Sequence, residues 1–161
     1  MEFGFTEEQE RLRKEVHDYY INTLPEDYLG SQLGYTKEGH HFEERLEQEA
    51  AKKGWLAPNW PKEWGGLGLN SLDAGVIKEE IGRLKGDFRG IMGLTIVGPG
   101  LFMYGTEEQK KKWLPPIARG EAVWDEAFTE PNAGTDEANQ QTRAVPDGDD
   151  YIINGQKVYI G

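Results

Sequence analysis

The spacing of apolar residues changes near residue 122, and this change limits the folds that the chain can adopt. Before it, apolar residues recur every three or four positions within several segments, which is typical of amphipathic helices. After it, short apolar runs alternate with Gly, Pro, Asn and Asp, which is typical of strands joined by tight turns. The sequence therefore predicts an α+β fold, with an all-α domain over residues 1–121 and the first strands of a β domain over residues 122–161.

The helical part contains the sequence Thr-Glu-Glu-Gln twice, at residues 6–9 and 106–109. In this capping box the Thr hydroxyl accepts a hydrogen bond from a backbone N–H and the Gln side chain reaches back, so each copy predicts the start of a helix. Helices are expected at about residues 7–24, 38–53, 71–84, 88–103 and 107–114. Because proline lacks an N–H and crowds the preceding turn, the fourth should break at Pro99 and the fifth should stop at Pro115.

Residues 55–69 connect two of the predicted helices, and their apolar residues show neither the helical nor the strand spacing. They contain three Trp among several Pro and Gly residues. Pro and Gly favour fixed turns, and large aromatic rings contribute most when they are buried. This segment is therefore predicted to be a fixed, buried connection and not a flexible linker.

The β part is predicted from its turn signals. Strands are expected at residues 123–128, 141–145, 151–153 and 157–160. The last two flank Asn154-Gly155, and Asn-Gly is the strongest short hairpin signal; Asp147-Gly148 marks a further turn. About forty residues of β structure bury too little apolar area to stand alone, so we expect an unfinished sheet in a truncated chain. The alternative is a small sheet that packs on the helices as one α+β domain.

The composition excludes several classes of function. The net charge of −11 argues against a nucleic-acid partner, because phosphate contacts need clustered Lys and Arg. Without cysteine the chain has no disulfide, thiol nucleophile or Cys-ligated metal, and no metal site is predicted. The longest apolar run, residues 91–103, is shorter than the roughly 20 residues of a membrane span. The N-terminus lacks the basic and apolar regions of a signal peptide, so the expected location is cytoplasmic.

Four motifs occur in a fixed order, and together they resemble the N-terminal part of the acyl-CoA dehydrogenase family. They are Tyr104–Lys110, Leu114–Ile117, Phe128–Asp136 and Tyr151–Lys157. The resemblance implies a truncated acyl-CoA dehydrogenase-like fold, in which an N-terminal helical bundle is followed by the beginning of a β-barrel domain. It also implies FAD as cofactor, an acyl-CoA substrate oxidised to the 2,3-enoyl-CoA, an electron acceptor and a homo-oligomer. The family's catalytic glutamate generally lies in a C-terminal bundle, so this chain should hold no catalytic residue and be inactive alone.

The resemblance also implies which residues contact the flavin. They are Phe128, Thr129, Gly134, Thr135 and Tyr159. The backbone at Phe128 and the Thr129 hydroxyl would bond the pyrimidine edge of the isoalloxazine, where donors stabilise the negative charge of the reduced flavin. The Thr135 hydroxyl would donate to the flavin phosphates or the acyl-CoA, Gly134 would let the backbone approach closely, and Tyr159 would lie beside the flavin.

Two carboxylates in the same stretch, Glu130 and Asp136, could be mistaken for a catalytic pair. We expect them to fix the turn instead, by accepting hydrogen bonds from backbone N–H groups. The chain departs from the family at Gly161, where many members have a Thr or Ser that bonds flavin N5, and at Glu126, where an aromatic residue is common. From the residues alone, a loop with Asx-type turns and no ligand is the favoured interpretation of the stretch, and the ordered resemblance favours a flavin site.

A second hypothesis is a non-catalytic α+β protein, derived from the same fold, that binds or assembles with a partner. Its support is the net charge of −11 and the glycine at position 161. Within the enzymes, acyl-CoA oxidases, nitroalkane oxidases and flavin monooxygenases share the scaffold, and the fold does not choose among them.

Overall fold

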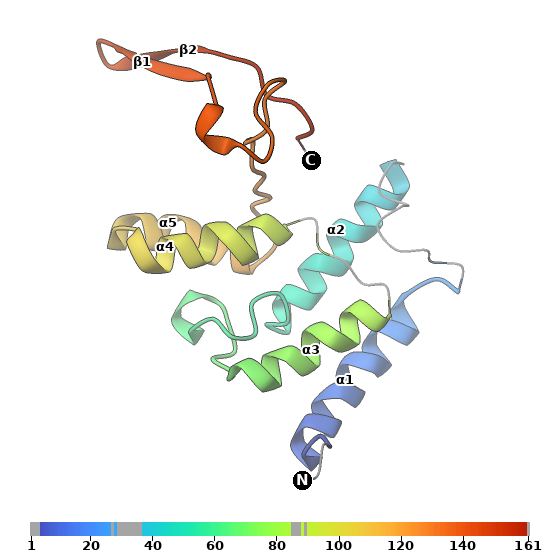
Figure 1. The fold of residues 1–161 in the computed structure, drawn as a ribbon. Coiled ribbons are helices and arrows are strands. Elements are labelled where there is room, and N and C mark those ends of the chain that lie inside the picture. Colours follow the sequence, from blue (N-terminus) through green and yellow to red (C-terminus); the bar gives the residue numbers. More distant parts are fainter. Residues whose placement is uncertain (1–3, 27, 29–36, 85–87, 89, 161) are drawn as a thin grey trace. The chain divides into compact units, whose positions relative to one another are not determined.

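The computed structural model describes residues 4–26, 28, 37–84, 88 and 90–160. The chain divides into two units, Met1–Val123 and Trp124–Gly161, whereas the sequence-based boundary lies between residues 121 and 122. The first unit consists of helices (Figure 1). They are α1 (Glu7–Thr23), α2 (Lys37–Lys52), α3 (Ser71–Arg83), α4 (Gly98–Tyr104) and α5 (Glu107–Ala118), with a 3₁₀ turn at Lys62–Trp64 and a π-helical turn at Gly93–Val97.

The two helix starts predicted from the capping boxes are confirmed. Thr6 and Thr106 each accept a hydrogen bond from the N–H of the Gln three residues later, and each Gln side chain accepts one from the N–H of its Thr. Asn70 caps α3, because its side chain accepts from the N–H groups of Leu72 and Asp73. These helices therefore begin where local side chains satisfy N–H groups that have no helical partner.

The predicted break at Pro99 is wrong, because the chain stays helical there. Pro99 falls in the first turn of α4, a position at which the missing N–H and the fixed φ of proline are tolerated. The turn before it is widened, since the Gly98 N–H donates to the carbonyl of Gly93, five residues back. The π-helical turn thus carries the helix past the proline.

The predicted stop at Pro115 is also wrong, because α5 continues through both prolines to Ala118. Leu114, Ile117 and Ala118 are all buried, so packing holds the last turn in place. The carbonyls of Pro115 and Pro116 accept hydrogen bonds from N–H groups of the following loop. Tertiary packing here outweighs the local preference of proline to end a helix.

The core of the first unit includes the connection between α2 and α3. Trp55 and Trp60 are 2% and 4% exposed, and Tyr20 of α1 stacks on Trp55 with ring centroids 6.3 Å apart. The N–H of Gly68 donates to the Trp60 carbonyl at 2.9 Å, which folds the connection back on itself. The prediction of a fixed, buried connection is confirmed.

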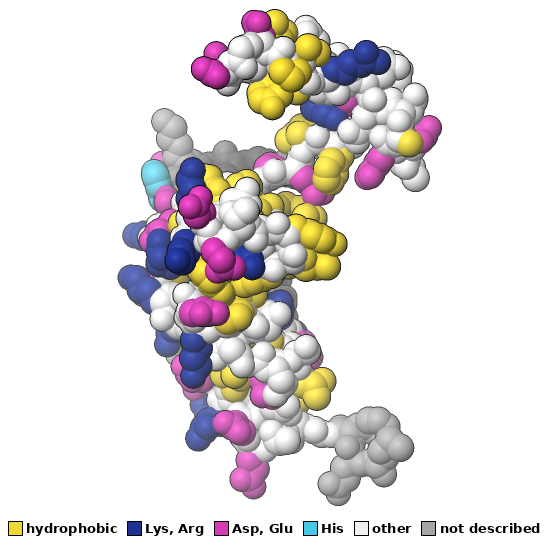
Figure 2. Space-filling view, turned by 90° about the vertical axis from the view of Figure 1, so that its left-hand side faces the viewer, with side chains coloured by type: hydrophobic (Ala, Val, Ile, Leu, Met, Phe, Trp, Pro, Cys, Tyr) yellow, Lys and Arg dark blue, Asp and Glu magenta, His cyan; other side chains and the backbone are white. Residues whose placement is uncertain are grey.

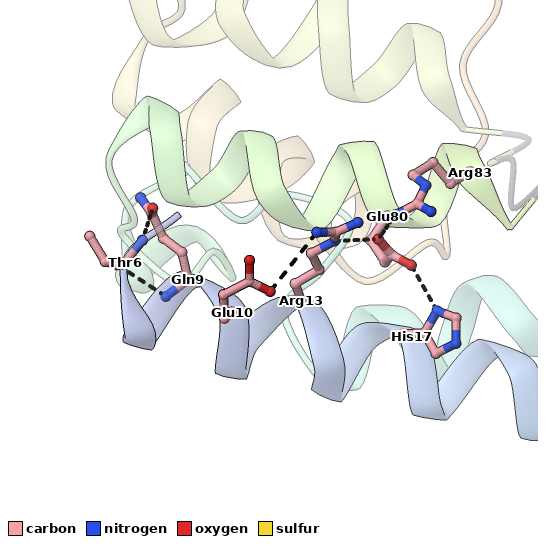
Figure 3. Close-up of polar contacts among 7 residues, drawn as sticks. All are labelled: Thr6, Gln9, Glu10, Arg13, His17, Glu80 and Arg83. Carbon is pink, nitrogen blue, oxygen red and sulfur yellow. Dashed lines mark hydrogen bonds and ion pairs between the residues drawn. The ribbon is translucent and has the colours of Figure 1, made fainter. Parts of the chain in front are cut away.

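A buried carboxylate joins α1 to α3 (Figure 3). The side chain of Glu80 is 3% exposed, and one of its oxygens lies 2.9 Å from Arg13 Nε and 3.0 Å from Arg83 Nη1. Its other oxygen lies 2.8 Å from His17 Nδ1. Burial alone would raise the pKa of this carboxyl, but hydrogen bonds from Arg13 and His17 and the charge of Arg83 lower it below its ordinary value. Glu80 therefore stays ionised between the two helices.

Charges of both signs are interspersed on the surface. On the face drawn in Figure 2, Lys and Arg side chains of the helical unit lie among Asp and Glu and do not gather into one basic area. Within the only dense basic run of the sequence, Lys110 pairs with Glu107 at 3.0 Å and the Lys112 ammonium lies over the Trp113 ring. No helix among the described residues is long and apolar enough to cross a membrane.

The second unit contains an antiparallel sheet of two strands, β1 (Arg143–Asp147) and β2 (Asp150–Asn154) (Figure 1). Helices followed by a small antiparallel sheet confirm the α+β fold class. The hairpin turns at Gly148, whose φ of 64° suits glycine, so the prediction of a hairpin around Asn154-Gly155 is wrong.

Gly155 meets a different requirement. A Cβ at this position would lie 2.7 Å from Thr142 Cα and 2.1 Å from Thr142 Oγ1, so glycine allows two segments to approach each other closely. The strands predicted at residues 123–128 and 157–160 are absent from the described part of the chain, because neither segment has a neighbouring strand with which to form a ladder.

Candidate functional site

The predicted flavin stretch folds into a tight loop in the second unit. The Glu130 N–H donates to the Ala133 carbonyl at 2.9 Å, and the Ala133 N–H donates to the Glu130 carbonyl at 3.1 Å. Two predicted flavin contacts, at residues 128–129, precede this turn, and two, at residues 134–135, follow it. The turn therefore places both pairs on one loop.

A second segment lies against the residues before the turn. The Val158 N–H donates to the Thr129 carbonyl at 3.0 Å, and Lys157 Nζ donates to the Phe128 carbonyl at 2.9 Å. Tyr159 follows directly, with a left-handed φ of 57° and a side chain that is 95% exposed. The structure thus brings the backbone at Phe128 and Thr129 next to the segment that carries Tyr159.

The side chain of Glu130 holds this arrangement together. Its carboxylate accepts hydrogen bonds from the N–H groups of Gln141 (2.7 Å) and Thr142 (2.9 Å) and from Lys157 Nζ (2.9 Å). The residue is only 7% exposed. The expectation that Glu130 fixes the turn through backbone N–H groups is confirmed.

The donors around this carboxyl lower its pKa to about 2. They are the Thr142 side chain, the Gln141 N–H, the Lys157 ammonium and the Thr142 N–H. The Thr142 hydroxyl is close but makes no hydrogen bond of good geometry, so the two backbone N–H groups and the Lys157 ammonium are the donors that bond this carboxylate. Because a group with this pKa is ionised at neutral pH and is a weak base, Glu130 is not suited to abstract a proton.

The corresponding expectation for Asp136 is wrong. Its carboxylate makes no capping bond to the 3₁₀ turn at Glu137–Asn139, and its backbone carbonyl accepts from the Asn139 N–H instead, at 3.1 Å. The reason is its backbone, since φ of −83° and ψ of 74° differ from the extended conformation of a side-chain cap. The Asn139 side chain closes this side of the loop by donating to the Asn132 carbonyl.

Two of the predicted contact residues present donors that the chain itself leaves unused. Within the part of the chain that the structure describes, the N–H and hydroxyl of Thr129 and the hydroxyl of Thr135 donate no hydrogen bond. A Cβ added at Gly134 would meet no atom within 4 Å, so packing does not require this glycine. Free donors beside an open stretch of backbone suit a ligand that carries oxygen or nitrogen acceptors.

Lys157 is the site residue that sequence reasoning missed. It belongs to the Tyr151–Lys157 motif, but it lies 27 positions from Glu130, so no local pattern connects the two. The one available signal is composition, because Lys157 and Arg143 are the only basic residues from residue 124 to the end of the chain.

Comparisons with known proteins find relatives over almost the whole chain. Residues 6–121 match the family model described as "Acyl-CoA dehydrogenase, N-terminal domain". The chain is 39% identical over 162 residues to the acyl-CoA dehydrogenase FadE26 of Mycobacterium tuberculosis, a match that covers 99% of this chain and 40% of that protein.

Solved structures share the fold across both units. A chain of the ChsE4-ChsE5 complex from Mycobacterium tuberculosis matches with a TM-score of 0.82 and 34% identity, over 99% of this chain and 40% of that one. An acyl-CoA dehydrogenase complexed with FAD from Bacillus anthracis matches with a TM-score of 0.69 and 29% identity, over 97% of this chain and 27% of that one. This chain spans about 40% of the length of the curated relatives it matches.

Proposed function

Because the chain belongs to the acyl-CoA dehydrogenase family, we propose that it forms the N-terminal part of an FAD-dependent enzyme that oxidises an acyl-CoA thioester to the 2,3-enoyl-CoA. The observation that carries the proposal is the position of Thr129. Its carbonyl accepts from the Val158 N–H, which holds the loop beside the segment of Tyr159, while its N–H and hydroxyl donate to no atom of the described residues.

The donors of the half-buried Thr129 and the exposed Thr135 fit a flavin. The flavin would supply the hydride acceptor, and its reduced form carries negative charge along one edge of the ring. We propose that Thr129 donates to that edge, where a preorganised donor stabilises the charge. Thr135 would donate to a phosphate, Gly134 would let its backbone approach, and the exposed Tyr159 ring would lie against the flavin.

The base that removes the substrate α-proton is proposed to come from a residue outside this chain. A base works best when its pKa lies near the working pH, and the pKa of Glu130 is about 2. Its three N–H donors would also have to be given up before its carboxylate could reach a substrate. We therefore propose that Glu130 stabilises the loop and does not transfer a proton.

Purifying the complete protein that contains this chain tests the proposal. We expect visible flavin absorbance that bleaches when an acyl-CoA is added without oxygen, and acyl-CoA-dependent reduction of an electron-accepting dye. We also expect light scattering to show an oligomer, as one of the matched chains is part of a complex. The 161-residue chain alone should show no such reduction. A complete protein that holds no flavin and reduces no dye would refute the proposal and favour a non-catalytic binding role.

Replacing Gly134 with Ala separates cofactor binding from folding. The new Cβ meets nothing within 4 Å, so the melting temperature should not change. If the flavin approaches this backbone as proposed, FAD binding should weaken about tenfold, which corresponds to a loss of roughly 1.4 kcal/mol. Equilibrium titration with FAD measures the effect. Gly155→Ala is the contrasting variant, because its Cβ collides with Thr142 and should disturb the fold itself. Unchanged FAD affinity in Gly134→Ala would remove Gly134 from the site.

A further inference from the structure

We propose that Lys157 is a positioning residue of the flavin site, which orients and strengthens the Thr129 N–H donor by holding the Phe128 carbonyl. The proposal rests on the proposed function for its flavin and on this chain's geometry for everything else. Phe128 C=O and Thr129 N–H belong to the same peptide group, so what binds one end acts on the other.

The geometry of this peptide group carries the argument. No cis peptide bond occurs among the described residues, so the Phe128 carbonyl and the Thr129 N–H point in opposite directions from one rigid plane. Lys157 Nζ holds the carbonyl at 2.9 Å. The peptide plane is thereby fixed, and the N–H is aimed away from Lys157, where no atom of the described chain accepts it.

The ammonium is itself held in place. Its partners are the Phe128 carbonyl, Glu130 Oε1 at 2.9 Å and Gln140 Oε1 at 3.3 Å, which match the three donors of a lysine. The side chain is 22% exposed and the Glu130 side chain is 7% exposed, so water weakens this pair less than it weakens a surface pair. Lys157 therefore has one well-defined position.

The charge of Lys157 also changes the strength of the Thr129 donor. A cation at the carbonyl oxygen polarises the peptide, which makes its N–H a stronger hydrogen-bond donor. Such a donor stabilises the anionic reduced flavin more than the neutral oxidised flavin. From residue 124 onward the chain has eight acidic residues and only one other basic residue, Arg143, so little else supplies this effect.

The test compares three variants of the complete protein: Lys157→Met, Lys157→Arg and Arg143→Met. Lys157→Met should weaken FAD binding about tenfold or more and shift the flavin reduction potential to more negative values. Lys157→Arg should restore both in part, because it keeps the charge. Arg143→Met removes the same charge from an exposed position on β1 and should change neither. If Lys157→Met fails to fold, Lys157→Gln is measured instead, and the potential should shift in the same direction.

Two outcomes would overturn the proposal. In the first, Lys157→Met has the same FAD affinity and flavin reduction potential as wild type and as Arg143→Met, and only its melting temperature falls. Lys157 would then be a purely structural residue. The second outcome concerns the flavin-free protein, in which we expect the Val158 N–H to exchange with deuterium faster in Lys157→Met than in wild type. Equal exchange rates would mean that Lys157 does not hold the Val158 segment against Thr129. This second measurement still tests whether Lys157 holds the Thr129 segment if wild type binds no flavin, an outcome that would refute the proposed function and the role of Lys157 towards a flavin.

Discussion

Replacing Glu80 with Ala is expected to lower the free energy of unfolding of the helical unit by about 3 kcal/mol, the lower end of the range for removing one member of a buried ion pair. The carboxylate is 3% exposed and has partners on both α1 and α3. Its removal leaves His17 and Arg83 without this anion, and leaves Arg13 with only the more exposed Glu10, at 3.9 Å. Because the side chains of Arg13, His17 and Arg83 are 29%, 45% and 53% exposed, water offsets part of the loss.

The neighbouring residue supplies the matched control. Glu79 lies on the same helix with an exposed side chain, so Glu79→Ala should change stability by no more than about 0.5 kcal/mol. Urea titration of both variants measures the difference. Equal midpoints for Glu79→Ala and Glu80→Ala would show that the cluster between α1 and α3 contributes nothing to stability.

The pKa of Glu80 gives this prediction a pH dependence. Its pKa is lower in the folded state than its ordinary value of 4.5, so the folded protein binds a proton there less readily than the unfolded chain does. The stabilisation is therefore fully present above about pH 4.5 and is lost as the pH falls through the lower, folded-state pKa. Below about pH 4.5, wild type should lose melting temperature more steeply than Glu80→Ala. If the melting temperatures of the two proteins fell in parallel with pH, the lowered pKa of Glu80 would be contradicted.

The helix starts were predictable because their causes are local. Thr6 and Thr106 each cap a helix through a Gln only three residues away, so the sequence contains the whole interaction. The extension of α5 through Pro115 was not predictable in this way. It depends on burial of Leu114 and Ile117, which only the assembled fold supplies.

The hairpin shows why turn residues alone mislead. Asn154-Gly155 and Asp147-Gly148 are both good turn sequences, and burial normally decides between such alternatives, because a shift of register moves side chains to the wrong face. Within the second unit every residue of β1 and β2 is exposed, so burial specifies no register. The close approach of Gly155 to Thr142 fits the observed register, in which Arg143 pairs with Asn154, and this contact joins residues that no local turn signal connects.

The candidate site also has a part that local sequence predicts and a part that depends on contacts between distant residues. The Glu130 turn was predictable, since the two residues at its centre, Pro131 and Asn132, are types that favour turns. The contact between Lys157 and Phe128 joins positions 29 apart, and the sequence around neither residue predicts it. Sequence reasoning thus found the loop that presents the donors but not the side chain that aims them.

Replacing Gly66 with Ala is expected to lower the free energy of unfolding of the helical unit by about 3 kcal/mol, at the upper end of the usual cost of overpacking. The new Cβ would lie 2.1 Å from the Trp60 carbonyl oxygen and 2.6 Å from that of Ala57. Both are backbone atoms, so no side-chain rotation relieves the clash. The Trp60 ring cannot yield either, because it packs edge-to-face on Phe102 and lies against Gly98, where a Cβ would come within 2.1 Å of it.

Gly75→Ala is the control for this prediction, because it makes the same chemical change at an exposed position of α3. Its Cβ would meet nothing within 4 Å, so the gain in helix propensity should stabilise the unit by roughly 0.5–1 kcal/mol. The two alanines should therefore shift the unfolding midpoint in opposite directions. A Gly66→Ala protein that unfolds at the wild-type midpoint would mean that residues 55–69 adjust freely. The connection between α2 and α3 would then be a flexible linker, and its buried Trp residues would not be fixed by their backbone.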